Sequence, residues 1–83
     1  MLTYMLGMEQ ASAGDDASAA HTFRELADRD AYVPAFHMAG QALVRLDRVP
    51  EACDILRLGI AAAKAAGDSH ALGEMQVLLE SLE

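Results

Sequence analysis

Three side chains have the types and the spacing of a possible metal site. His37 and His70 lie 33 residues apart, and Glu74 follows His70 by four residues, which puts it one turn further along the same helical face. Two imidazoles and a carboxylate are ligands that zinc uses in proteins. They would converge only if the helices that carry the histidines were neighbours, with axes about 8 to 10 Å apart. The alternative, which we favour, is that the histidines are exposed or capping residues, with no metal and no cofactor bound.

Catalytic chemistry has almost no support in the sequence. The chain contains no glycine-rich phosphate-binding loop and no nucleophile in a recognisable strand, turn and helix frame. Cys53 follows Ala52 on a predicted packing face, so we expect a small buried hydrophobic side chain and not a reactive thiol. His21 has Glu25 one turn later, and this pair is expected to be solvated. The sequence therefore predicts a protein that is not an enzyme.

Composition and charge exclude several classes of partner. The 83 residues are 53% hydrophobic and 23% charged, which is typical of one small folded domain. The net charge of −7 repels phosphate backbones and anionic lipid headgroups, so we expect no nucleic acid and no membrane partner. A lone cysteine cannot form an intrachain disulfide, and the apolar first eight residues lack the basic residues of a signal peptide. A cytoplasmic location is the expectation.

The residues that break helices divide the chain into five segments. Gly14 and Gly67 suit helix C-caps, each followed by an aspartate that suits an N-cap, while Pro34 and Pro50 suit the first turn of a helix. Alanine is abundant, which favours helix. The predicted helices are roughly 2 to 12, 16 to 29, 34 to 46, 50 to 66 and 69 to 82. Turns this short make consecutive helices antiparallel, so the predicted fold class is all-α, built of stacked helical hairpins.

The sequence repeats with a period of 33 residues. Leu6-Gly7, Ala39-Gly40 and Leu72-Gly73 are spaced by that interval, and Ala19 and Phe23 coincide with Ala52 and Leu56. A glycine within a helix costs about 0.5 to 1 kcal/mol relative to alanine, so its recurrence indicates close helix approach. We expect each alanine to face the glycine twelve residues before it, with Phe23 and Leu56 filling the space beyond. The predicted packing set is Leu6, Gly7, Ala19, Phe23, Ala39, Gly40, Ala52, Leu56 and Gly73.

These residues resemble the tetratricopeptide repeat, whose pattern contains L-G, then A-x3-F, over about 34 residues. The resemblance implies a short right-handed solenoid made of repeat one (residues 1–33), repeat two (residues 34–67) and a capping helix (residues 68–83). Thr3 and Gln10 depart from the pattern, since they stand where repeat one should carry large aromatic residues. The last helix presents one apolar stripe of Leu72, Met75, Leu78, Leu79 and Leu82, which suits a terminal cap.

The resemblance also implies a function, because the first helices of such repeats line a concave groove that binds extended peptides or a partner's helix. Carried over by position, it gives a first rung of Tyr4, His37 and His70, a second of Met8, Gln41 and Glu74, and a third of Ala11, Val44 and Val77, with Arg45 at the edge. The predicted groove residues are Tyr4, Met8, His37, Gln41, Val44, Arg45, His70 and Glu74. The subgroup that grips acidic chaperone C-termini needs Lys and Asn on these rungs, where this chain has Tyr, Met, His and Gln. The predicted surface is mildly acidic and part aromatic, so we expect Lys- or Arg-containing segments with an apolar anchor. The bland alternative is that these are ordinary exposed helix residues without a ligand.

A second function class remains open, a small structural protein that associates with itself. The first predicted hairpin has no capping helix before it. Leu2 and Met5 should point towards the place where such a helix would stack, which predicts an exposed apolar patch and a weak homodimer. The two hypotheses, a scaffolding or peptide-binding module and a self-associating protein, differ in the expected oligomeric state.

Overall fold

The computed structural model describes residues 2–83, with side chains described from Thr3 onward, and it contains five helices. They are α1 (Leu2–Ser12), α2 (Asp16–Asp30), α3 (Val33–Arg45), α4 (Val49–Ala66) and α5 (Ser69–Leu82). Each bound lies within one residue of its prediction. No strand occurs in the described part of the chain, so the all-α prediction is confirmed.

The helix ends are set by the residues that the sequence singled out. Asp15 and Asp68 cap α2 and α5 by accepting hydrogen bonds from the backbone N–H groups of Ser18 and Ala71, at 3.2 and 3.1 Å. Pro34 and Pro50 lie in the first turns of α3 and α4. Gly67 ends α4 with a φ of 71°, a left-handed conformation that glycine adopts without strain. Local stereochemistry therefore fixes where most helices begin and end.

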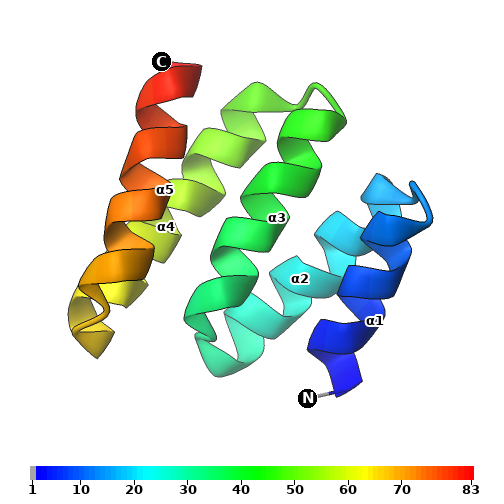
Figure 1. The fold of residues 1–83 in the computed structure, drawn as a ribbon, viewed down its shortest axis with the longest axis horizontal. Coiled ribbons are helices and arrows are strands. Elements are labelled where there is room, and N and C mark those ends of the chain that lie inside the picture. Colours follow the sequence, from blue (N-terminus) through cyan, green and yellow to red (C-terminus); the bar gives the residue numbers. More distant parts are fainter. Residues whose placement is uncertain (1) are drawn as a thin grey trace.

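The helices form a flattened body of 30 × 28 × 17 Å. Each helix packs against the next one in the chain, and α3 also contacts α5. In Figure 1, α1, α3 and α5 lie across the front of the molecule, with α2 and α4 behind them. The antiparallel hairpins predicted from the short turns are therefore present.

The core lies between α2, α3 and α4 and is rich in alanine. Six alanines have no exposed surface at all, which allows the helix backbones to come close together. They are Ala19, Ala35, Ala39, Ala42, Ala52 and Ala63. The largest fully buried side chains are Phe23, Leu26, Ile55, Leu56 and Met75. Of these, only Met75 comes from α5. The four leucines of the apolar stripe predicted for this helix are half-buried against the core.

The helices approach closely at Gly7 and Gly40, but the partner differs from the expectation. A Cβ added to Gly7 would lie 2.7 Å from the Phe23 ring, and one added to Gly40 would lie 2.7 Å from Leu56 Cδ2. The atoms nearest the glycines thus belong to the large residues sixteen positions later, and not to Ala19 and Ala52. The glycines make room for a bulky side chain instead of a second backbone.

Two members of the predicted packing set are not packed. Leu6 is 49% exposed, and a Cβ added to Gly73 would meet nothing within 4 Å. Ala39 is the counterpart of Leu6, and it is buried because α3 has packed helices on both sides. Leu6 and Gly73 lie on the first and last helices of the array, where one neighbour is missing from the described residues. Their exposure corrects the expectation that all three Leu-Gly and Ala-Gly pairs pack alike.

A further glycine, Gly59 of α4, lies at a close contact that the repeat comparison missed. Its added Cβ would lie 2.5 Å from Met75 Sδ and 2.6 Å from Phe36 Cβ, so α3, α4 and α5 meet at this point. No larger side chain fits there without displacement of a neighbour. Gly59 is the contact that seats α5 on the preceding hairpin.

The two departures in repeat one have a structural explanation. Gln10 accepts a hydrogen bond of 2.7 Å from the hydroxyl of Thr22, a residue that is only 7% exposed. Tyr4, the residue after Thr3, packs edge-to-face on Phe23 with ring centroids 5.4 Å apart. A polar pair and a tyrosine one position later therefore occupy the space where the repeat pattern expects aromatic residues.

Candidate functional site

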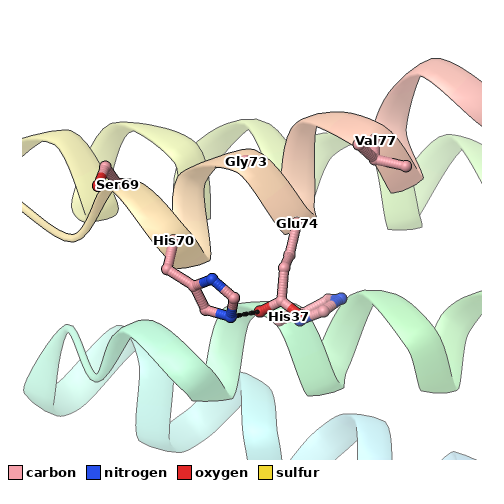
Figure 2. A pocket seen from close by; sticks show the side chains of 6 residues that line it. All are labelled: His37, Ser69, His70, Gly73, Glu74 and Val77. Atoms are coloured by element: carbon pink, nitrogen blue, oxygen red, sulfur yellow. Dashed lines mark ion pairs between the residues drawn. The ribbon is translucent and has the colours of Figure 1, made fainter.

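A shallow open pocket lies between α3 and α5, with a volume of about 560 Å³. It is lined by His37 of α3 and by Ser69, His70, Gly73, Glu74 and Val77 of α5. Figure 2 shows that His70 and Glu74 point from α5 towards α3. Glu74 follows His70 by four residues, so it lies one turn further along the same face of α5. The N-cap Asp68 fixes where this helix begins. The pocket unites three of the eight predicted groove residues.

His37 is held in place by its own helix. Its Nε2 atom lies 3.3 Å from Nε2 of Gln41, one turn further along α3, and both side chains are half-buried. This distance is within hydrogen-bonding range of the two side chains. Gln41 therefore orients the ring that forms the α3 wall of the pocket.

The α5 wall carries the charge of the site. Nε2 of His70 lies 3.4 Å from Oε1 of Glu74, with side chains 88% and 50% exposed. No lysine or arginine lines the pocket. Glu74 therefore presents a solvated carboxylate that has only an imidazole as partner.

The metal-site alternative has no support in the described residues. Nowhere in residues 2–83 do three His, Cys, Asp or Glu side chains come close enough together to hold a metal ion. Nε2 of His37 instead faces Gln41, and Nε2 of His70 faces Glu74.

The remaining predicted groove residues have other surroundings. Met8 is 40% exposed on α1, and Val44 is half-buried against the core. Arg45 forms a 2.7 Å ion pair with Asp16 of α2, which joins the end of α3 to the start of α2. The structure thus places Arg45 at a contact between hairpins, outside the pocket lining.

Tyr4 belongs to an aromatic cluster at the α1 end of the molecule. Besides Phe23 it meets Tyr32 edge-to-face, with ring centroids 5.5 Å apart. Burial, and secondly the neighbouring Tyr32, raises the pKa of Tyr4 above its ordinary value of 10.0. Tyr4 is therefore a half-buried side chain that packs against the core.

Sequence reasoning did not assign Ser69 and Gly73 to the groove, since it placed Gly73 in the packing set, and it gave no role to Tyr32, the neighbour of Tyr4. Ser69 and Gly73 line the pocket, and they lie one turn apart on α5, so helical spacing from His70 and Glu74 is the signal that identifies them. Tyr32 was missed because it precedes α3 at the N-cap, outside any helical pattern. Its position two residues before Pro34 marks it only as the start of a helix.

The other candidate reactive groups are structural or solvated. Cys53 is buried at 7% exposure, and His21 pairs with Glu25 at 3.3 Å on the surface.

No helix in residues 2–83 has the length and apolar character needed to cross a membrane.

Antiparallel helical hairpins stacked at a fixed sequence period define a helical repeat protein. Scans against protein-family profiles and against curated proteins find no match. Solved structures do match. The solution structure of a tetratricopeptide repeat domain protein from Salinibacter ruber is 31% identical, with 96% of this chain and 82% of that chain covered and a TM-score of 0.89. A crystal structure of a tetratricopeptide repeat domain protein from the same organism is 30% identical, with 95% and 89% covered and a TM-score of 0.87.

The chain belongs to the tetratricopeptide repeat family, and the resemblance found in its sequence is confirmed. Domains of this kind are in general protein-interaction modules, since stacked repeats create extended surfaces for partners.

Proposed function

We propose that the chain is a non-catalytic protein-interaction or scaffolding module that binds an extended peptide or a partner's helix on the face formed by α1, α3 and α5. The groove residues in this proposal are Tyr4, Met8, His37, Gln41, Val44, Arg45, His70 and Glu74. Repeat one comprises residues 1–33, repeat two residues 34–67, and residues 68–83 form the capping helix. The buried free thiol of Cys53 supports a reducing compartment such as the cytoplasm.

One observation carries this proposal, the open pocket in which His37 of α3 and His70 and Glu74 of α5 occur together. Pockets that combine apolar walls with a few convergent polar groups are the usual places for ligands. Here Gly73 and Val77 supply the apolar wall, and the imidazoles and the carboxylate supply the polar groups.

Charge favours a basic partner segment over an acidic one. The chain has a net charge of −7, and α5 contains Glu74 and Glu80 but no lysine or arginine. Acidic C-terminal tails are repelled by this field, whereas Lys or Arg side chains are attracted. A surface this small supports only weak affinity, roughly micromolar to millimolar.

An NMR titration of the purified chain tests the proposal. One short peptide with Lys or Arg and a single apolar anchor is compared with a peptide that ends in an acidic tail. We expect saturable shifts at His37, Gln41, His70 and Glu74 for the basic peptide and none for the acidic one. Shifts centred on Arg24 and Arg57, which lie on α2 and α4, would place the site on the opposite face and overturn the proposal.

Self-association is the second candidate, and the exposed side chains of α1 favour it. Met5 is 55% exposed and Leu6 49% exposed, while α1 packs chiefly against α2. The side chain of Leu2, the other residue expected in this patch, lies outside the described residues. Exposed apolar patches mark interfaces, so we propose a weak homodimer through α1, which is tested by the oligomeric state.

A further inference from the structure

In the first and second rungs of the groove, the side chains become more polar from α1 through α3 to α5. The first rung runs from Tyr4 on α1 through His37 on α3 to His70 on α5, and the second runs from Met8 through Gln41 to Glu74. On each helix the two members are one turn apart, so they share a face. Both rungs begin apolar at α1 and end polar or anionic at α5.

The α1 end has the features of an anchor site for an apolar side chain. Met8 is 40% exposed and lies one helical turn after Tyr4, which meets Tyr32 edge-to-face with ring centroids 5.5 Å apart. No charged residue occurs between Leu2 and Met8. A flexible, partly exposed thioether one turn from an aromatic side chain adapts readily to aliphatic or aromatic guests.

The α5 end has the features of a subsite for a cation. The carboxylate of Glu74 is half exposed, and its one ion-pair partner in the described residues is the imidazole of His70. Arg57 is engaged by Glu83 at 2.7 Å and Arg45 by Asp16 at 2.7 Å, so these cations of the neighbouring helices are directed elsewhere. A lysine or arginine from a partner is the complementary group.

We propose that the groove is polarised and selects an extended segment that carries an apolar or aromatic residue at one end and a Lys or Arg at the other, separated by about six residues. This inference rests on the proposed peptide groove and specifies its ligand. The spacing follows from the architecture. The helices α1, α3 and α5 follow one another along the longest extent of the molecule, which is 30 Å (Figure 1). Subtracting the Cα radius of about 2.3 Å for each end helix, and allowing for helix tilt, leaves roughly 20 Å from α1 to α5, and an extended chain advances about 3.3 Å per residue.

A set of matched synthetic peptides tests the spacing. Each peptide has a Gly/Ser backbone with blocked termini and carries one Phe and one Arg, either about six residues apart or adjacent. Two further peptides replace the Phe by Ser or the Arg by Gln. We expect the widely spaced peptide to bind roughly two- to tenfold more tightly than the other three, since only it reaches both subsites.

Two substitutions with matched controls test which end binds which residue. Glu74→Gln should weaken binding of the Arg peptide about two- to fivefold and leave binding of the Gln peptide unaffected. Glu80→Gln, on the same helix, removes the same charge and is the control; it should not change the difference in affinity between the Arg and Gln peptides. Met8→Ala should weaken the Phe peptide and not the Ser peptide. Leu58→Ala, at an exposed apolar side chain of α4 outside the groove, is the control for Met8.

The outcomes separate this inference from the proposed function. The polarity is refuted, and the groove stands, if the peptides with wide and adjacent spacing bind equally tightly and change the NMR chemical shifts of the groove residues equally. The same conclusion follows if Glu74→Gln weakens binding of the Arg and Gln peptides alike. If no peptide of the set perturbs His37, Gln41, His70 or Glu74, the groove itself is refuted. Selective loss in each matched pair supports the polarised groove.

Discussion

At the scale of the residue, equivalent glycines of successive repeats differ in how closely they are packed. Gly40 has Leu56 Cδ2 at 2.7 Å from the position of an added Cβ, while Gly73, its counterpart 33 residues later, has open space. Both glycines lie within helices. The cost of a glycine in a helix is therefore offset by packing at Gly40 and is not offset at Gly73.

The stability of two alanine variants should differ in sign for this reason. Gly73→Ala should raise the free energy of unfolding by about 0.5 to 1 kcal/mol, because alanine is the better helix former and nothing obstructs it. Gly40→Ala should lower it by about 1 kcal/mol or more, since overpacking against the fully buried Leu56 outweighs the gain in helix propensity. Denaturant unfolding measures both. Equal changes in the two variants would contradict the assignment of Gly40 to a close contact.

Tyr4 gives the protein an alkaline pH dependence. Its pKa is raised in the folded state by burial and by Tyr32, so above about pH 10 the unfolded chain loses the phenolic proton before the folded chain does. The folded state then binds more protons than the unfolded state, and the free energy of unfolding falls as pH rises from about 10 through the raised pKa. Below pH 10 both states are protonated at Tyr4 and the effect is absent.

Tyr4→Phe isolates this contribution. The variant keeps the ring that packs on Phe23, so its free energy of unfolding should decline less steeply above about pH 10 than that of the wild type, by up to about 1.4 kcal/mol per pH unit. Denaturant unfolding at a series of alkaline pH values measures the difference. Parallel curves for the two proteins would show that Tyr4 titrates normally in the folded state.

At the scale of the element, α5 has one fully buried side chain among those that pack it against the core. Met75 is its only side chain below 9% exposure, and Gly59 of α4 provides the space into which Met75 fits. The ion pair between Arg57 and Glu83 is exposed and contributes little. Met75 is thus the one fully buried anchor of the capping helix, and the half-buried leucines of its stripe add to it.

Met75→Ala should therefore loosen α5 before the rest of the molecule. Removal of a fully buried methionine costs about 2 to 5 kcal/mol, a large part of the stability of so small a protein. We expect faster amide hydrogen exchange along α5, while α2 and α3 lose less protection. Gln76→Ala, one residue further and exposed, is the matched control and should leave exchange unchanged.

At the scale of the whole molecule, the two ends of the solenoid differ in how they meet water. At the α5 end, Ser69 and Gln76 occupy the positions of Phe36 and Leu43 one period earlier, and both are exposed. Polar residues thus replace the buried pair where no further helix follows in the described residues. The α1 end has no such replacement at Met5 and Leu6, which remain apolar and exposed.

This asymmetry predicts association through α1. Sedimentation velocity should show the wild type moving from monomer towards dimer as its concentration rises towards the millimolar range. Met5→Glu with Leu6→Glu should shift the equilibrium to monomer and leave helical circular dichroism intact, because neither side chain is buried. A wild type that stays monomeric throughout would refute the dimer. The polar pair Ser69→Ala with Gln76→Ala, at the other end, serves as control.

How far the sequence alone predicts each feature depends on how local its cause is. The helix bounds followed from capping aspartates, two prolines and Gly67, because backbone stereochemistry acts within a few residues. The period of 33 followed from Gly7, Gly40 and their matching residues, since equivalent helices bury equivalent faces. Family, fold class and the net repulsion of anions were thus determined before any coordinate was known.

Only the tertiary structure decided how individual side chains share the space between helices. Phe23 and Leu56 fill the glycine positions, Tyr4 turns onto Phe23, Asp16 engages Arg45, and Gly73 is left open. Each outcome depends on which neighbours are present on every side at once, and residues far apart in the chain supply those neighbours. A repeated pattern specifies equivalent positions, but packing of the whole array determines which of them are buried, paired or free to bind.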